Sequence, residues 1–178
     1  MDTASPLSPA DVTLVDTNVF IGIGNPGTAK YRRFRRVIER AGVTLFVPSR
    51  VEDEIEQGGV KPALERAQDE GWVRIVSGPT VSHSKATTAQ DIVRRAIASK
   101  SSDKDEHDVE KADPVFAGLA VEYILDEEQS DKVTVITADR LAQKSIKTAM
   151  ESLGYDGQVS TLTLWDLIDR DDDDITLI

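Results

Sequence analysis

Short continuous runs of apolar residues recur along the chain, and segments with helical periodicity separate them. Four runs of strand length cover residues 12–15, 44–47, 72–76 and 133–137, and a weaker one covers residues 158–162. Short apolar runs without alternation are typical of strands that are buried on both faces of a parallel sheet. The pattern therefore predicts a central parallel sheet of four or five strands.

Between these runs, apolar residues recur at the three- and four-residue spacing of a helix that buries one face. The three stripes consist of Phe34, Val37, Ile38 and Ala41, then Val115, Phe116, Leu119, Ala120, Tyr123 and Ile124, then Ala142, Ile146, Ala149, Met150 and Leu153. Gly154 ends the third stripe, and a further helix is expected to open near Ser49. Alternating strands and helices predict an α/β fold, a three-layer α/β/α sandwich with right-handed crossovers.

The bulk composition indicates one compact domain. The chain has 178 residues, of which 39% are hydrophobic, enough for one core. We expect an N-terminal extension over residues 1–11, the domain itself over 12–168 and an acidic tail over 169–178. The absence of cysteine excludes disulfides, thiolate zinc sites and cysteine nucleophiles. Without a membrane-length apolar run or a signal-peptide pattern, we expect a soluble, cytoplasmic protein with no membrane partner.

The net charge of −11 at first argues against a nucleic-acid partner, because such binding gains energy by neutralising phosphates. Much of the acidity is aspartate, including residues 171–174. This composition resembles that of surfaces in proteins from salt-loving archaea. At about 1 M salt the Debye length is about 3 Å, so remote acidic residues stop repelling RNA. We therefore interpret the acidity as a halophilic solvation device.

Acidic residues follow the predicted strands at positions where ligands gather in such sheets, beyond the carboxyl ends of strands. Asp16 comes directly after the run 12–15, and Asp139 follows the run Val133–Thr137. Asp113 precedes Pro114, an arrangement typical of a helix start. Glu54 borders the inward face of the helix expected after Pro48.

At these positions the sequence resembles the PIN-domain ribonucleases, which include the VapC-like toxins and archaeal PIN nucleases. The family motifs match at Asp16-Thr17-Asn18, at residues 48–55 with Glu54 before Ile55, at the helix that Asp113 opens, and at Thr137-Ala138-Asp139-Arg140. The order and approximate spacing of the four acids agree, and the resemblance spans residues 12–167.

The resemblance implies cleavage of single-stranded RNA with Mg²⁺ or Mn²⁺, either as the toxin of a toxin–antitoxin pair or in RNA maturation. It also implies an antitoxin protein as a possible partner, and a possible homodimer. The chain departs from the short toxin form in residues 80–112, which we interpret as an insertion-like, charged connection. This departure argues against the toxin role more than against the chemistry.

Four carboxylates close together need a cation, because their repulsion would otherwise raise their pKa values until protons neutralised them. A hard divalent ion accepts oxygen ligands, polarises a phosphoryl oxygen and lowers the pKa of a water that attacks the phosphodiester. We expect Asp16, Glu54, Asp113 and Asp139 to be the metal ligands and the catalytic residues. Residues expected to orient these ligands are Thr17, Asn18 and Thr137.

Contacts to RNA phosphates are expected from positive charge near these acids. The candidates are Arg32, Arg33 and Arg36 in a basic segment interleaved with aromatic residues, together with Arg50, Arg140 and Lys144, which flank the acids. The same arginines could simply form a solvated helix face.

Other interpretations remain open. Asp113 and Asp139 could be helix caps, and Glu52 or Asp53 could take the role of Glu54. A catalytically silent binding module with the same fold is the main alternative function. A Mg²⁺-dependent phosphoryl-transfer protein of the haloacid-dehalogenase or receiver type fits less well, because Asn18 stands where the first type needs a second aspartate.

Overall fold

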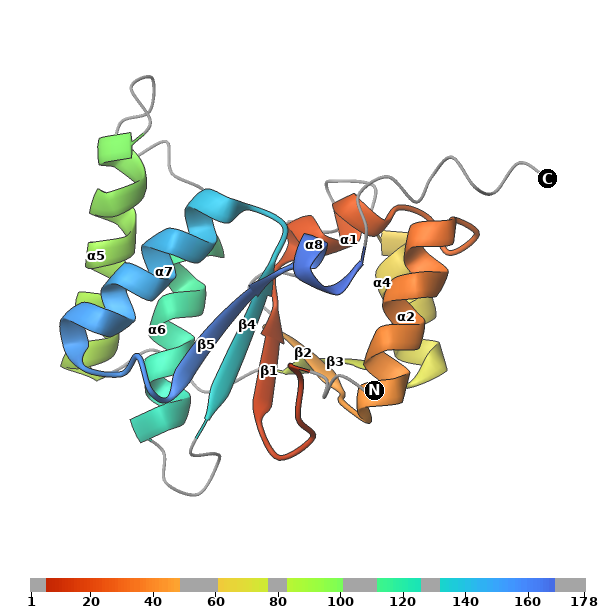
Figure 1. Cartoon of the computed structure of the whole chain (residues 1–178), viewed down its shortest axis with the longest axis horizontal. Helices are drawn as coiled ribbons and strands as arrows, with labels where there is room; N and C mark the ends of the chain where they lie inside the picture. The colour runs from red at the N-terminus through yellow and green to blue at the C-terminus, as the bar shows by residue number, and fades with distance from the viewer. Residues whose placement is uncertain (1–5, 49–60, 77–82, 101–111, 126–131, 169–178) are drawn as a thin grey trace.

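The central element of the fold is a five-stranded, all-parallel sheet (Figure 1). The structure is a computed structural model that describes residues 6–48, 61–76, 83–100, 112–125 and 132–168. The strands are β1 (Val12–Val15), β2 (Leu45–Pro48), β3 (Val73–Val76), β4 (Val133–Thr137) and β5 (Val159–Thr163), arranged in the order β3-β2-β1-β4-β5. The predicted parallel sheet is confirmed.

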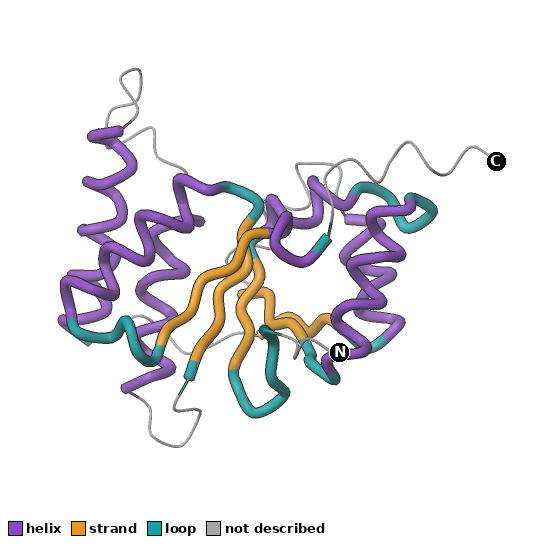
Figure 2. The backbone as a smooth tube through the Cα atoms, viewed as in Figure 1, coloured by secondary structure: helices purple, strands orange, loops and turns teal. Residues whose placement is uncertain are grey.

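Helices cover both faces of this sheet and complete the three-layer sandwich (Figures 1 and 2). One layer packs against the first hydrophobic cluster and contains α1 (Thr17–Ile23), α2 (Ala29–Ala41), α4 (Lys61–Glu70) and the short α8 (Leu164–Leu167). The opposite layer packs against the second cluster and contains α5 (Ser84–Lys100), α6 (Ala112–Leu125) and α7 (Arg140–Leu153). Successive residues of a strand point to opposite faces of the sheet, so Leu14 belongs to the second cluster and Val15 to the first.

The strand order reverses between β1 and β4. From β1 the chain proceeds to β2 and β3 on one side, and then crosses to β4 and β5 on the other. In register, Val15 of β1 lies beside Ile136 of β4, and Thr137 of β4 lies beside Thr163 of β5. The crevice beyond the carboxyl ends at such a reversal is the usual ligand site of an open parallel sheet.

Local sequence signals set both ends of α2 and of α7. Thr28 caps α2 by accepting a hydrogen bond from the backbone N–H of Tyr31 at 3.2 Å, and Asp139 caps α7 in the same way through Leu141 at 2.8 Å. Both helices end at a left-handed glycine, Gly42 and Gly154. The caps fix where each helix axis meets the strand ends.

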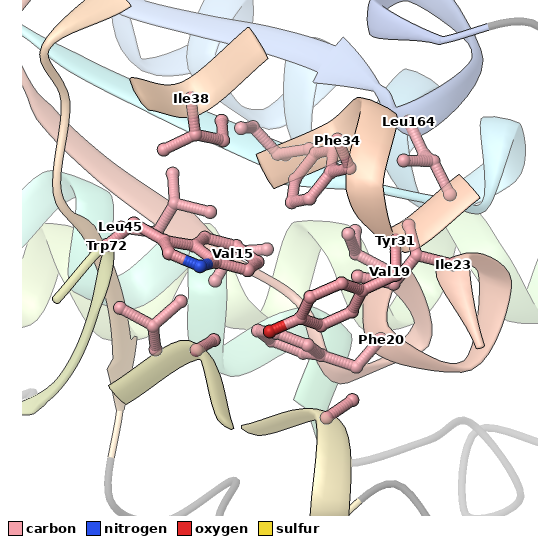
Figure 3. Close-up of a cluster of buried hydrophobic side chains, with 14 of the residues drawn as sticks. Val15, Val19, Phe20, Ile23, Tyr31, Phe34, Ile38, Leu45, Trp72 and Leu164 are labelled. Carbon is pink, nitrogen blue, oxygen red and sulfur yellow. The ribbon is translucent and has the colours of Figure 1, made fainter. Parts of the chain in front are cut away.

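Tyr31 and Trp72 of the first cluster (Figure 3) both donate to the partly buried carboxylate of Glu70, which ties α2 to α4. The Tyr31 hydroxyl donates to Glu70 Oε1 at 2.6 Å, and Arg35 forms an ion pair with the same carboxylate. The Tyr31 ring also packs edge-to-face on Trp72, with 5.6 Å between ring centroids. Burial, and secondly the bond to Glu70, raise the pKa of Tyr31 above its usual range. Trp72 thus packs against the rings of Tyr31 and Phe34 in the first cluster.

The boundaries of the elements agree with the sequence patterns to within about a residue for the strands. The structure adds α1, α4, α5 and α8, which the patterns did not predict. The interpretation of residues 80–112 as a charged connection is wrong for α5, because Ala86, Ala89, Val93 and Ile97 enter the second core cluster. The helix expected near Ser49 lies outside the described residues.

Within the part of the chain that the structure describes, no helix is long and apolar enough to cross a membrane.

Candidate functional site

Asp16 stands at the reversal of strand order, directly after β1. Its side chain is buried, with 3% of its surface exposed. Its backbone N–H donates to the carbonyl of Ile136 in β4 at 2.9 Å, so the residue is held between the two central strands. A carboxylate at this depth needs partners that stabilise its charge.

Asp16 occupies the N-cap position of α1, yet its side chain makes no capping hydrogen bond to the described backbone of that helix. Its carbonyl accepts from the N–H of Val19 at 3.1 Å, so the helix start is formed by backbone alone. Helix capping therefore does not explain the carboxylate of Asp16. Its orientation has another source.

The hydroxyl of Thr137, at the end of β4, connects Asp16 to the neighbouring strand. Thr137 Oγ1 lies 3.3 Å from Asp16 Oδ2. Thr137 Oγ1 itself accepts hydrogen bonds from the backbone N–H of Asp139 and from Asn18 Nδ2, each at 3.2 Å. A hydroxyl has two acceptor positions and one proton, and both acceptor positions are used here. The proton is therefore directed to Asp16 Oδ2.

Asn18 completes this network from the first turn of α1. Its Oδ1 accepts from the backbone N–H of Ala138 at 2.8 Å, which fixes the orientation of the amide and points Nδ2 at Thr137. Thr137 Oγ1 also lies 3.4 Å from Asn18 Oδ1, but its single proton is better placed on the charged carboxylate. Asn18 thus orients the hydroxyl of Thr137, which in turn donates to the carboxylate of Asp16.

Asp139 lies in the turn after β4 and is exposed. One of its oxygens, Oδ1, accepts from the backbone N–H of Leu141 at 2.8 Å, so Asp139 does cap α7. Its backbone N–H donates to Thr137, which joins it to the network around Asp16. The capping role and a ligand role are compatible, because a carboxylate offers two oxygens.

The side chains of the other two predicted acids, Asp113 and Glu54, lie outside the described part of the structure. Asp113 is the second residue of α6, so the helix begins one residue earlier than its predicted cap, and the side chain lies outside the described part of the structure. Glu54 also lies outside the described residues, as does Arg50. The side chain of Thr17, the first residue of α1, is likewise not described. Among the residues that are described, no group of three His, Asp or Glu side chains could hold a metal ion.

The predicted basic contacts fall on two helices. Arg140 and Lys144 are exposed on the first two turns of α7, directly after Asp139, and Lys144 lines a cavity of about 430 Å³ against β5. Arg32, Arg33 and Arg36 are exposed on α2, in the opposite layer.

Two contributors to the network were missed by sequence reasoning, the backbone N–H groups of Ala138 and Asp139. No residue pattern identifies them, because their direction depends on the conformation of the turn between β4 and α7. The sequence signal nearest to them was the hydroxyl two residues before Asp139.

Comparison with known proteins gives one family. A model of the family described as "Halobacterial PIN domain" matches residues 9–176, nearly the whole chain. No curated protein and no solved structure gives a match.

Proposed function

The chain belongs to the halobacterial PIN domain family, and from that premise we propose that it is a metal-dependent endoribonuclease that hydrolyses phosphodiester bonds in single-stranded RNA. PIN domains are in general nucleases. The observation that carries the proposal is the buried carboxylate of Asp16, which Thr137 of the adjacent strand orients at the reversal of strand order, next to Asp139.

The chemistry of the donors fits a hard divalent cation, Mg²⁺ or Mn²⁺. Asp16 and Asp139 offer carboxylate oxygens at one edge of the sheet, and oxygen is the ligand that these ions prefer. We propose that both residues hold the ion, with Asp113 and Glu54 as the further ligands that the family motifs name. Such an ion, when bound, activates water and offsets charge that develops on the phosphoryl group.

The residues of the chain supply orientation. Thr137 Oγ1 donates its proton to Asp16 Oδ2 and so orients the carboxylate that we assign as a ligand of the ion. Asn18 keeps the Thr137 hydroxyl from turning away, because it fills one of the acceptor positions of Oγ1. We propose that Glu54 orients the attacking water, and that Thr17 acts beside Asn18.

Positive side chains close to the acids are proposed to hold the RNA. Arg140 and Lys144 follow Asp139 on α7, and Arg50 follows Pro48 in the sequence. Together with Arg32, Arg33 and Arg36 of α2, they would contact phosphates, which gives affinity and salt dependence without reading the base sequence.

Two biological roles are compatible with this proposal: a toxin neutralised by an antitoxin protein, or an enzyme of RNA maturation. We propose a cytoplasmic location, and the halobacterial family supports a salt-adapted cell in which the net charge of −11 serves solvation. A homodimer is the proposed assembly. Expression with and without the product of the adjacent gene separates the two roles, because only a toxin arrests growth when expressed alone.

The central test is cleavage of single-stranded RNA in concentrated KCl with Mn²⁺, followed by chelation with EDTA. We expect cutting that stops on chelation and that Asp16→Asn abolishes, while its circular dichroism spectrum stays that of the wild type. The matched control is Asp69→Asn, an exposed aspartate on α4, which should cut normally. Cleavage that ignores EDTA, or full activity of Asp16→Asn, would overturn the assignment. No cleavage of any RNA would favour the silent binding module.

A further inference from the structure

Arg35 of α2 differs in its surroundings from Arg33, Arg36 and Arg40 of the same helix. Arg35 forms an ion pair with Glu70 of α4, and a second one with Glu39 of α2 itself at 2.8 Å. The hydrogen bond to Glu39 is the main cause that raises the pKa of Arg35. Its charge is thus used inside the fold. Arg33, Arg36 and Arg40 lie on another face of the helix, at the spacing that aligns residues along one side.

These three arginines line a pocket between α2 and the segment that contains α8. The pocket has a volume of about 280 Å³, and Trp165, Asp166 and Ile168 form its other wall. Lys30 adds a further positive charge at this place, because its Nζ lies over the Trp165 ring, 5.5 Å from the centroid. The pocket is thus basic on one side and partly aromatic on the other.

Among its described lining residues, the pocket carries more positive than negative charge. These residues include three arginines and one aspartate, a net charge of +2. The Oδ2 atom of Asp166 accepts the backbone N–H of Thr163 at 2.8 Å, which completes the start of α8. Arg36 and Arg40 are exposed and form no ion pair with any residue in the described ranges. Arg36 and Arg40 thus offer two guanidinium groups without an ion pair among the described residues, on a protein whose net charge is −11.

We infer that this pocket binds a phosphate group of the RNA strand, at a distance from the carboxylates. The inference rests on the proposed function in taking RNA as the ligand. Guanidinium groups match phosphate oxygens with paired hydrogen bonds, and three arginines line one wall of the pocket. The pocket volume of about 280 Å³ is smaller than the range of about 300–1,000 Å³ that is typical of sites for drug-sized ligands. Trp165 offers an apolar wall for the adjoining sugar or base.

The wall of the pocket that follows β5 begins at the sheet edge that carries Asp16. Thr137 of β4 pairs with Thr163 of β5, and α8 begins at the next residue. α1 connects the two places: it starts after Asp16, and a Cβ on Gly22 would lie 2.6 Å from Leu164 and 3.7 Å from Trp165 (Figure 1). The six residues from Asp16 to Gly22 correspond to about 9 Å along the helix. A strand of a few nucleotides can therefore reach from Asp16 to the wall of the pocket that Trp165 forms.

The acidic surface does not prevent this binding in concentrated salt. At about 1 M salt, charges further apart than about 3 Å are largely screened, whereas a guanidinium in direct contact with a phosphate is not. The pocket would thus supply short-range attraction where long-range steering is lost. The arrangement suits a protein that must bind RNA while its surface stays acidic.

The experiment measures binding separately from cleavage. A fluorescently labelled single-stranded RNA is titrated with protein in EDTA, and anisotropy gives the affinity at several KCl concentrations. The variants are Arg36→Gln and Arg36→Gln/Arg40→Gln, and the matched control is Arg95→Gln. Arg95 is exposed on α5, in the opposite helix layer, and lines neither described pocket. Circular dichroism in the same buffers confirms folding.

We expect the double variant to bind at least about tenfold more weakly, because each lost phosphate contact also removes released counterions. The plot of log affinity against log salt should become shallower by about 1.4, since each contact to a single strand contributes about 0.7. Arg36→Gln should show half that change and Arg95→Gln none. A merely structural role of Arg36 and Arg40 would not alter the salt slope.

The inference is overturned if the double variant keeps the wild-type affinity and slope, or if Arg95→Gln loses as much. RNA with a 5′-phosphate and RNA with a 5′-hydroxyl distinguish the source of the phosphate. Tighter binding of the first, lost in the double variant, identifies a terminal phosphate; equal binding, also lost, identifies an internal phosphodiester. If the double variant binds RNA more weakly but the wild type cuts no RNA, the pocket is supported and the nuclease function is refuted. Normal binding by a variant of an active nuclease would refute the pocket alone.

Discussion

Replacing Thr137 with valine removes the hydroxyl that links Asp16 to β4 and keeps the shape of the side chain. Thr137 is 1% exposed, so water cannot easily take the place of the lost oxygen. The variant deprives the Asp16 carboxylate of a donor, and it deprives Asn18 and the Asp139 N–H of an acceptor. It therefore tests whether the network matters for both the fold and the metal ligand.

The magnitude follows from the three bonds. The bond to the Asp16 carboxylate contributes about 1.5 kcal/mol, the low end for a charged acceptor because it is 3.3 Å long. The two bonds that Thr137 accepts contribute about 1 kcal/mol each. Asn18 is only partly buried and Asp139 is exposed, so water recovers part of that loss. We expect the free energy of unfolding to fall by about 2–3 kcal/mol, which moves the urea midpoint by about 1–1.5 M.

Urea unfolding in concentrated KCl measures the stability, and titration calorimetry with Mn²⁺ measures the metal affinity. Thr137→Ser is the matched control, because it keeps the hydroxyl and loses one methyl group at a cost of about 1 kcal/mol. Mutation of an outer residue that orients a ligand typically weakens metal binding about 10–100-fold. We expect that loss in Thr137→Val and a loss of no more than a few-fold in Thr137→Ser. Equal metal affinities in the wild type and Thr137→Val would refute the role of the hydroxyl.

Three further outcomes are expected from the packing of the first cluster. Tyr31→Phe should lower the free energy of unfolding by about 1–2 kcal/mol in urea titrations, because it removes the 2.6 Å bond to Glu70. Gly22→Ala should lower the free energy of unfolding by about 1 kcal/mol, because its Cβ would lie 2.6 Å from the fully buried Leu164. The overpacking costs about 1–3 kcal/mol, which outweighs a gain of about 1 kcal/mol in helix propensity. The control Gly27→Ala, with open space around its Cβ, should not destabilise the protein. Because burial raises the pKa of Tyr31 in the folded state, its contribution to stability is fully present below pH about 10 and is lost as the pH rises beyond it; urea midpoints should fall there, and less steeply in Tyr31→Phe.

Much of the fold could be predicted from the sequence because each buried strand is a short, unbroken apolar run. Val12–Val15 and Val133–Thr137 are predicted with the bounds that the structure has. α5 was missed because its buried face is made of small residues, such as Ala86 and Ala89, among serine, threonine and arginine. Local hydrophobicity is weak there, and packing against α6 and α7 decides the structure.

The candidate site is predictable in outline, because acids that follow adjacent parallel strands must share one edge. Asp16 and Asp139 follow that rule, and Thr137 lies where it can orient an acid. The separate uses of Arg35 and Arg36 could not be foreseen. They are neighbours in one basic segment, and only the position of Glu70 on another helix distinguishes them.

The pairing of β1 with β4 has a consequence for how the protein comes into being during translation. Thr137 and Asp16 are separated by 121 residues, and closing a loop of that length costs about 4 kcal/mol of chain entropy. A ribosome must release β4 before the two halves of the carboxylate network can meet. A nascent chain that stops short of Val133 therefore carries Asp16 without the hydroxyl that orients it.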